Sequence, residues 1–303
     1  MYFSQATIAA VVAAGLVSAA PATVAKRVAV TDADILQYAL TLEHLEDTFY
    51  REGLQKFSES DFKAAGFDSV VYNNVKTIAS DEAAHVEFLT GGLTAAGAKP
   101  VAACTYDFGV KDVKSFMATA SVLEGVGVSA YLGAAADIMS KGYLTAAGSI
   151  LTVEARHSSY VRASLKQKPF AQAFDTPLSL DEVYSLASGF IKSCPKENAA
   201  LPVKAFPALA LDPKAGTVKT GDEITLLTPN YILKGAEGPA TIYAAFISVT
   251  GPTFVEAKPV EGGFKVTVPK GFGGQSYVVL TSCKDAVNDD TVAAGPAIVE
   301  ISN

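Results

Sequence analysis

The sequence has no tryptophan, only three histidines and three cysteines, and no long run of basic residues. Its formal net charge of −7 over 303 residues argues against a nucleic-acid partner, because nothing along the chain would neutralise a phosphate backbone. The Gly-x-Ser-x-Gly motif of serine hydrolases, the phosphate-binding loop and the dinucleotide-binding fingerprint are absent. The sequence also has no Asn-x-Ser/Thr site for N-glycosylation. With these enzyme classes excluded, the placement of the few histidines becomes the informative feature.

The first residues predict a secretory signal. An apolar run from Ala6 to Val17 is followed by the small residues Ser18, Ala19 and Ala20. The run is too short to cross a bilayer, and the pair Lys26-Arg27 behind it predicts dibasic trimming. We therefore expect residues 1–27 to be a signal peptide and dibasic pro-segment. The mature protein is then expected to be secreted, outside the cell or in its wall, with no membrane contact.

The three cysteines fit an oxidising compartment, with one disulfide and one leftover thiol. We expect Cys104 to pair with Cys194, because both lie in segments that flank helical regions. Cys283 would then be the leftover thiol. Three unpaired buried thiols are the alternative.

The residue composition and the hydrophobic pattern change along the chain. From Thr31 to about Cys194 it is rich in Ala and Leu at helical spacing, with expected helices at 32–57, 61–96, 111–140 and 144–167 and a shorter fifth helix at 179–193. Thr31 or Asp32 would cap the first helix and Ser179 the fifth. Four long helices joined by short connections and one longer crossover, 97–110, predict a four-helix bundle.

The rest of the chain reads as strands. Runs such as "EITLLT", "GFKVTVP" and "QSYVVLTS" alternate with Gly and Pro, which is typical of an immunoglobulin-like β-sandwich. The expected fold class is therefore α+β with several domains. The predicted boundaries are 28–195 for the helical bundle, 196–207 for a Pro-rich linker and 208–303 for the β-sandwich.

Two of the three histidines share a pattern. "DEAAHVEFL" and "VEARHSSYV" each place a Glu three residues before a His, Glu82 with His85 and Glu154 with His157. Each pair continues the apolar stripe of its helix, so the two pairs should face the core. A buried carboxylate and imidazole are costly unless something compensates them, and a metal cation would do so.

The other two long helices supply matching carboxylates. "LEHLEDTFY" and "LEGVGVSAY" each place a Tyr seven residues after a Glu, Glu43 with Tyr50 and Glu124 with Tyr131, so the chain is a weak internal duplication. Four carboxylates and two imidazoles around one point are the ligand set of a di-iron or di-manganese centre. The predicted ligands are Glu43, Glu82, His85, Glu124, Glu154 and His157, and the predicted cofactor is two Fe or Mn ions.

Three neighbours of this set leave alternatives open. Glu46, one turn beyond Glu43, is a rival ligand of the first helix; we prefer Glu43 because the repeat aligns it with Glu124. His44 points away from the ligand face and reads as a surface or structural residue. Tyr50 and Tyr131 could bond a ligand carboxylate or relay electrons, and core packing is the role we favour for each.

These four segments, in this order, resemble the metal-ligand segments of the ferritin-like superfamily. More narrowly, with "CTYDF" and "FDTPLSLDEVYSLASGFIKSCP", the chain resembles its secreted branch of plant desiccation-related and fungal stress-response or late-sexual-development proteins. The resemblance covers about residues 30–207. It implies a four-helix bundle with a carboxylate-bridged dimetal centre held by the six predicted ligands. It leaves the reaction open, because members of the superfamily oxidise and store iron, remove peroxides or hydroxylate substrates.

Two functions of different classes follow. The first is a secreted dimetal oxidoreductase, ferroxidase or peroxide-removing, that acts on O2, peroxide or iron in stress or development. The alternative is a non-catalytic structural protein with a vestigial metal site, whose β-domain binds cell-wall glycan or a partner. An iron-storage cage is a third reading that the appended β-domain would obstruct; the oligomeric state is left open.

Overall fold

The computed structural model describes residues 30–229 and 241–302. The predicted signal peptide and the Lys26-Arg27 pair lie outside these residues. The helices and strands described below belong to one compact unit, Thr31–Asn303.

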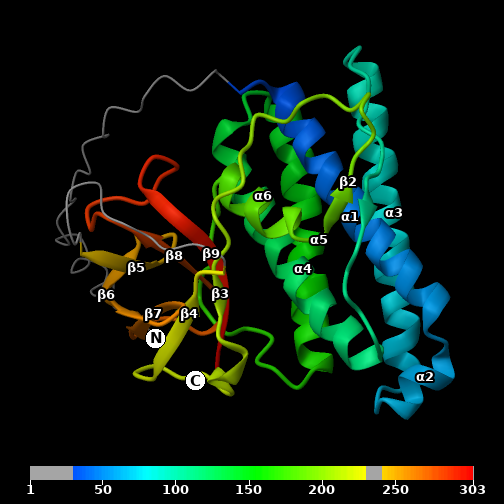
Figure 1. Cartoon of the computed structure of the whole chain (residues 1–303). Coiled ribbons are helices and arrows are strands. Elements are labelled where there is room, and N and C mark those ends of the chain that lie inside the picture. Colours follow the sequence, from blue (N-terminus) through cyan, green and yellow to red (C-terminus); the bar gives the residue numbers. More distant parts are fainter. Residues whose placement is uncertain (1–29, 230–240, 303) are drawn as a thin grey trace, which may run out of the picture. The chain divides into compact units, whose positions relative to one another are not determined.

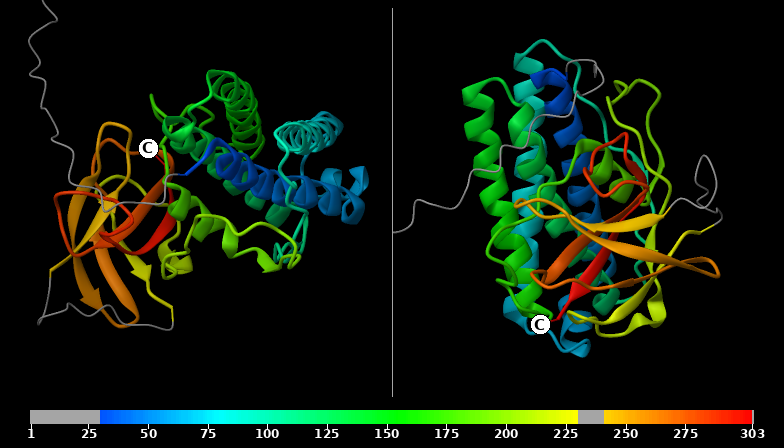
Figure 2. Two further views of the ribbon diagram at one scale, coloured as in Figure 1. Left: turned by 90° about the horizontal axis from the view of Figure 1, so that it is seen from above. Right: turned by 90° about the vertical axis from the view of Figure 1, so that its left-hand side faces the viewer.

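Four long helices run side by side (Figures 1 and 2): α1 (Asp32–Lys56), α3 (Ser69–Ala95), α4 (Val113–Ala134) and α5 (Lys141–Ser164). Helix α1 packs mainly against α3, and α4 against α5. Shorter helical elements are α2 (Glu59–Ala64), η1 (Ala135–Asp137) and α6 (Leu180–Ser188). The predicted four-helix bundle is confirmed.

Capping residues explain where the helices start. Thr31, rather than Asp32, is the N-cap of α1, and its side chain forms a reciprocal capping box with Asp34. Ser179 forms the same arrangement with Glu182 at the start of α6. Both motifs satisfy backbone N–H groups that a helix leaves without internal partners.

Four expected helices had wrong boundaries. The helix expected at 144–167 lies at Lys141–Ser164, three residues earlier at each end. The segment 61–96 is two helices, because Gly66 takes a positive φ of 98° after α2 and Asp68 then caps α3. The fifth helix ends at Ser188 instead of 193, since β2 (Ile191–Ser193) pairs with β1 (Thr105–Tyr106) in the crossover. Helix α4 ends at Ala134 instead of 140, where the chain tightens into η1.

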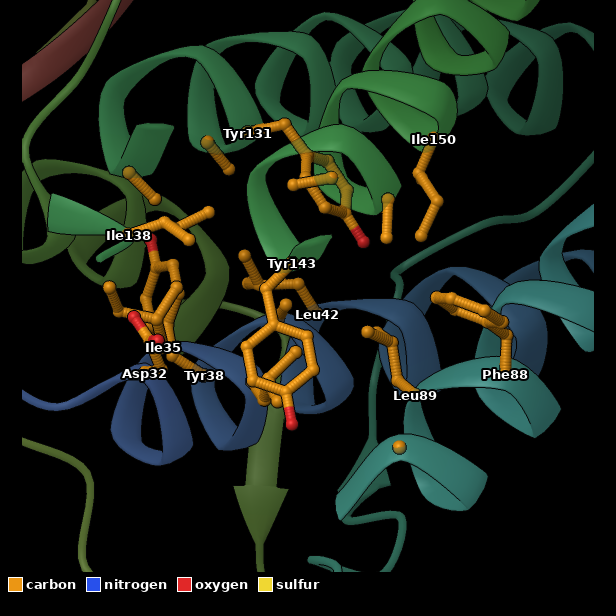
Figure 3. Close-up of a pocket in the computed structure, with 17 residues that line it drawn as sticks. Asp32, Ile35, Tyr38, Leu42, Phe88, Leu89, Tyr131, Ile138, Tyr143 and Ile150 are labelled. Atoms are coloured by element: carbon orange, nitrogen blue, oxygen red, sulfur yellow. The ribbon is translucent and has the colours of Figure 1, made fainter. Parts of the chain in front are cut away.

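The core of the bundle has two parts with different packing. Around Tyr50 it is filled by aromatic rings, including Phe49 and Phe116. Around Tyr131 the neighbouring residues are smaller, and they leave a cavity of about 60 Å³ (Figure 3). We call this cavity the Tyr131 chamber; its lining includes Ile35, Ala39, Leu89, Gly92, Ala134 and Ile150.

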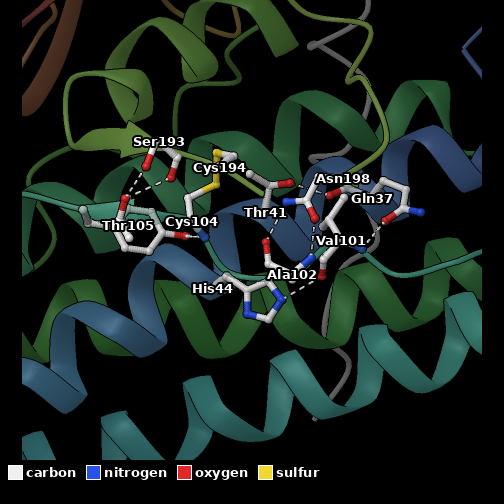
Figure 4. The surroundings of a disulfide bond; sticks show 11 residues. Gln37, Thr41, His44, Val101, Ala102, Cys104, Thr105, Ser193, Cys194 and Asn198 are labelled. Carbon is white, nitrogen blue, oxygen red and sulfur yellow. Dashed lines mark hydrogen bonds between the residues drawn. A yellow bond between two sulfur atoms is a disulfide. The ribbon is translucent and has the colours of Figure 1, made fainter. Parts of the chain in front are cut away.

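A disulfide fastens the crossover to the segment after α6. Cys104 is bonded to Cys194 (Figure 4), as the sequence predicts, and Cys283 is not disulfide-bonded. The adjoining β1–β2 pair and a bond from Thr105 Oγ1 to Ser193 O support the same connection. The bond closes a loop of 90 residues that contains α4, α5 and α6.

The C-terminal part is an antiparallel β-domain. Its strands are β3 (Ala210–Leu211), β4 (Glu223–Leu227), β5 (Ile242–Phe246), β6 (Thr253–Val260), β7 (Gly263–Thr267), β8 (Gly274–Thr281) and β9 (Val292–Ile301), with a short helix η2 (Pro213–Ala215). The order β3-β4-β7-β6-β5-β8-β9 is that of the immunoglobulin fold, four strands on one sheet and three on the other. The first half of β6 pairs with β5 and its second half with β7, so β6 passes from one sheet to the other.

One hydrophobic cluster contains residues from both sheets, among them Leu226, Phe246, Val278 and Val299. The predicted β-sandwich is therefore confirmed. The domain boundaries at 195/196 and 207/208 stay a prediction.

Strands β8 and β9 contact the bundle. Tyr277 donates its hydroxyl to the carbonyl of Gly125 on α4 at 2.8 Å. Arg162 on α5, itself 6% exposed, binds both carboxylate oxygens of Glu300 at 2.9 and 2.7 Å. Two-point Arg–carboxylate pairs are geometrically specific, so this contact fixes how β9 meets α5.

Candidate metal centre

The six predicted ligands lie together in the middle of the bundle, between the two core parts. Glu43 comes from α1, Glu82 and His85 from α3, Glu124 from α4, and Glu154 and His157 from α5. All four carboxylates are 0% exposed, and the histidines are 8% and 6% exposed. The apolar stripes that predicted this burial are confirmed by the buried neighbours Ile78, Leu89, Ile150 and Val161.

One nitrogen of His85 meets three carboxylates. Its Nδ1 atom is 3.2 Å from Glu43 Oε2, 3.2 Å from Glu82 Oε2 and 3.2 Å from Glu154 Oε1. The contacts with Glu43 and Glu82 have hydrogen-bond geometry. A ring nitrogen carries at most one proton, so the imidazole alone cannot neutralise three carboxylates.

His157 has a comparable place on the other side. Its Nδ1 atom is 3.0 Å from Glu82 Oε1 and 3.5 Å from Glu124 Oε2, although neither contact is directed as a hydrogen bond. Its Nε2 atom lies 3.1 Å from the carboxylate of Asp81. A carboxylate at one ring nitrogen of a histidine orients the other nitrogen toward a metal in many metalloproteins.

Two overlapping sets of ligand atoms result. Glu43, Glu82, His85 and Glu154 form one set, and Glu82, Glu124, Glu154 and His157 form the other, with the atoms of each set within 4.8 Å of one another. Glu82 and Glu154 belong to both sets, so each could contribute to a metal in either set. The described residues thus bring all six predicted ligands together.

The polar atoms at the centre lack partners. Among the described residues, the buried side-chain atoms with no hydrogen bond are Glu82 Oε1, Glu124 Oε2, both oxygens of Glu154, and His157 Nδ1. Buried polar atoms are normally paired, and all five of these belong to the predicted ligand set. Hard carboxylate oxygens with one imidazole per set suit Fe or Mn. The residues present therefore fit a pair of metal ions.

Comparison with known proteins identifies the helical part. Residues 31–167 match the model of a family described as "Ferritin-like domain". This segment is a ferritin-like domain. The chain is also similar to Protein rds1 of Schizosaccharomyces pombe, with 31% identity over 180 residues, which are 59% of this chain and 44% of rds1. The chain thus spans less than half the length of this curated relative.

Burial and repulsion shift the pKa values in the ferritin-like domain. Burial raises the pKa of Glu82 to about 7, although contacts with His157 and His85 counteract it. Burial, then the charge of Glu82, raises the pKa of Glu154 well above its usual range. Burial alone would lower the histidine values, but neighbouring carboxylates raise the pKa of His85 to about 12 and that of His157 to about 11. Without metal, the centre thus holds protons at neutral pH.

The two tyrosines cross between helices. Tyr50 on α1 donates to Glu124 Oε1 on α4, and Tyr131 on α4 donates to Glu43 Oε1 on α1 at 2.5 Å. Burial and then the adjacent carboxylate raise the pKa of both phenols well above the usual value. Core packing, the role favoured from the sequence, is therefore only part of what these tyrosines do, because each hydroxyl also binds a predicted ligand.

Glu46 lies beside the centre, outside both sets of ligand atoms. It is 4% exposed, and burial, then the charge of Glu154, raises its pKa well above the usual value. A Cβ added to Gly127 would lie 3.0 Å from both Glu46 Oε1 and Glu154 Oε2, so this glycine leaves room for the two carboxylates. The repeat aligns Gly127 with Glu46, so the second half of the repeat has a glycine where the first half has this carboxylate.

The remaining histidine has a structural role, which was one of the roles expected for it. His44 Nε2 lies 3.0 Å from the carbonyl of Val101 in the crossover, near the disulfide (Figure 4). Sequence reasoning missed Asp81, although it directly precedes Glu82 in "DEAAH" and could have been examined as a carboxylate partner of a histidine.

Proposed function

We propose that this protein is a secreted dimetal oxidoreductase, in which two Fe or Mn ions act on O2 or peroxide, with Fe(II) oxidation or peroxide removal as its reaction. The observation that carries the proposal is that two four-residue sets share Glu82 and Glu154, while five buried polar atoms of these sets form no hydrogen bond with the described residues.

The chain's residues have distinct roles in this proposal. Glu82 and Glu154 would bridge the metals. Glu43 with His85 would complete one coordination sphere, and Glu124 with His157 the other. A bound dimetal pair supplies electrons to, or takes them from, an oxygen substrate. The protein holds the carboxylates through Tyr50 and Tyr131 and keeps bulk water out, since every carboxylate of the set is fully buried.

The Cys104–Cys194 bond supports an extracellular location, because disulfides persist in oxidising compartments and are rare in the cytosol. A role in stress or development belongs to the same proposal and rests on the resemblance noted from the sequence.

Metal analysis of protein purified from its native secretion route tests the proposal. We expect two Fe or Mn per chain, and an anaerobic Fe(II) titration of the stripped protein should saturate at the same ratio. Admission of O2 or peroxide should then oxidise the bound iron. Glu82→Ala should abolish both loading and oxidation. Glu87→Ala, on the exposed face of the same helix, is the matched control and should change neither.

Less than one metal per chain after reconstitution, together with an unchanged Glu82→Ala variant, would contradict the proposal. Full loading without any reaction toward O2 or peroxide would instead favour the structural alternative, in which the β-domain binds glycan or a partner.

A further inference from the structure

We infer that the Tyr131 chamber takes up a small apolar molecule and passes it to the candidate metal centre. Dioxygen is the molecule of this class that the proposed function uses, so this part of the inference rests on that function. Uptake into the chamber itself does not depend on it.

The chamber lies directly above the ligands. Each long helix contributes lining residues from the turns next to its ligands, at the Tyr131 end of the bundle. Ala39 is one turn from Glu43, Leu89 one turn from His85, and Ile150 one turn from Glu154. The ring of Tyr131, two turns from Glu124, lines the chamber, while its hydroxyl bonds Glu43 (Figure 3). Tyr131 thus contacts both the chamber and the centre.

Two polar groups of the lining, those of Asp32 and Tyr38, are engaged elsewhere. The carboxylate of Asp32 accepts the backbone N–H groups of Met139 and Ser140 at 2.7 and 3.0 Å. The hydroxyl of Tyr38 donates to the carbonyl of Leu180 at 3.4 Å. Most of the remaining lining is aliphatic carbon and small residues. Cavities of this kind stay dry and accept apolar guests, including xenon.

The internal repeat explains why the space beside Tyr131 is open while the space beside Tyr50 is filled. An offset of 81 positions relates Glu43 to Glu124, Tyr50 to Tyr131 and also Ile35 to Phe116. At the Tyr50 end the Phe116 ring lies 6.0 Å from that of Tyr50, and it is so close to Gly53 that an added Cβ there would lie 2.1 Å from the ring. At the Tyr131 end the corresponding residue is Ile35, which lines the chamber. The smaller side chain leaves open the space that its counterpart fills.

The chamber also reaches the outside of the bundle. Its lining includes Phe88 on α3, which is 55% exposed, and the half-buried Tyr143 and Ala147 on α5. These residues mark an outer side of the chamber between α3 and α5, which we take as the entrance for an apolar molecule.

A second cavity offers a competing route. It measures about 160 Å³ and is lined by Glu46, Gly127 and Leu186 among others. Glu46, a buried carboxylate with no hydrogen bond to the described residues, lines this cavity, whereas the carboxylate of Asp32 in the chamber is bonded to backbone N–H groups. We therefore favour the chamber for an apolar molecule. The experiment must therefore compare both cavities.

Xenon binding tests the chamber in the full chain, with or without metal. We expect one xenon atom there in crystals under xenon pressure. It should disappear in Ile35→Phe, which restores the aromatic residue of the other repeat, and in Gly92→Leu, whose side chain enters open space in the lining. Gly91→Leu is the matched control: it lies on the same helix, is exposed and lines neither chamber, so xenon should stay.

The rate at which O2 oxidises bound Fe(II) tests the passage. In both filled variants it should fall by roughly tenfold or more, with metal content unchanged, because a close-packed interior admits small molecules only through openings. Gly91→Leu and Leu186→Phe, in the second cavity, should react at the normal rate. Absence of xenon from the wild-type chamber overturns the inference. So does a normal rate in the filled variants, or slowing in Leu186→Phe alone. A chain that takes up xenon but no metal would leave the chamber standing and reject the proposed function.

Discussion

Tyr131 on α4 and Glu43 on α1 are joined by a hydrogen bond that leaves the second carboxylate oxygen directed at His85. The hydroxyl binds Glu43 Oε1 at 2.5 Å, and Glu43 Oε2 lies 3.2 Å from His85 Nδ1. The repeat reproduces the arrangement, because Tyr50 binds Glu124 Oε1 while Glu124 Oε2 faces His157. Each tyrosine therefore fixes which oxygen of its partner is available to a metal.

Tyr131→Phe should weaken metal binding by about 10- to 100-fold, as removal of a partner that orients a ligand usually does. Stability of the metal-free protein should fall by only about 1 kcal/mol, because the ring stays packed and one hydrogen bond is lost. Isothermal titration with Fe(II) or Mn(II) and thermal unfolding measure the two effects.

The control for this change is Tyr38→Phe. Tyr38 is also buried but bonds the carbonyl of Leu180, so loss of its hydroxyl should cost stability without changing metal affinity. Equal metal affinities of Tyr131→Phe and Tyr38→Phe would show that the phenol of Tyr131 is only a packing element.

Shared and unshared ligands should respond differently to substitution. Glu82 belongs to both sets of ligand atoms, whereas Glu43 and Glu124 each belong to one. Glu82→Gln should therefore lose both metals, while Glu43→Gln or Glu124→Gln should keep about one metal per chain, because each leaves one set complete. Metal analysis after dialysis against a weak chelator gives the counts. A full complement of two metals in Glu82→Gln would contradict the bridging role.

The bundle and its centre could be predicted from sequence because burial there follows spacing. Glu82, His85, Glu154 and His157 interrupt apolar stripes at three- and four-residue steps, and a helix turns such positions to one face. The β-sandwich could be predicted for a related reason, since alternation and turn residues mark strands locally.

What could not be predicted depends on contacts between distant segments. The end of α6 at Ser188 is set by pairing of β2 with β1, more than eighty residues earlier in the chain. The break between α2 and α3 depends on one glycine, which a helical pattern tolerates in other places, such as Gly91 and Gly92. The bond of Tyr131 to Glu43 and the chamber beside it arise from packing of helices, which no single stripe encodes.

Metal affinity should rise with pH. In the metal-free protein the pKa of His85 is about 12, that of His157 about 11 and that of Glu82 about 7. Ligands bind metals without these protons, so loading at pH 7 should release about two or more protons per chain. Titration calorimetry in buffers with different ionisation enthalpies measures that number. Binding without proton release would contradict these protonation states.

Stability of the metal-free protein should fall as pH rises, in contrast to metal affinity. Because the folded pKa of Glu82 is raised from 4.5 to about 7, its protonated form favours folding below pH 4.5, and this contribution is lost as pH rises through 7. The raised pKa values of His85 and His157 act in the same sense: their contribution begins to decline above pH 6.5, and its loss is complete only at about pH 11 to 12. The difference in Tm between loaded and metal-free protein should therefore widen from pH 5 to pH 8. The Tm of metal-free Glu82→Gln should fall less over this range than the Tm of the metal-free parent protein, because the variant lacks the Glu82 contribution.

Gly127→Ala should lower metal affinity without destabilising α4, the helix that carries Gly127. Alanine favours a helix over glycine by about 1 kcal/mol, but the new Cβ would lie 3.0 Å from Glu154 Oε2 and Glu46 Oε1. One of these carboxylates must move, and Glu154 is shared by both sets of ligand atoms. We expect metal affinity to fall while Tm of the metal-free protein stays the same or rises. Gly148→Ala on α5 has open space around its Cβ and should raise Tm with metal affinity unchanged. If Gly127→Ala binds metal normally, then Glu46 gives way instead of Glu154, and a Glu46→Gln, Gly127→Ala double variant should bind like the single one.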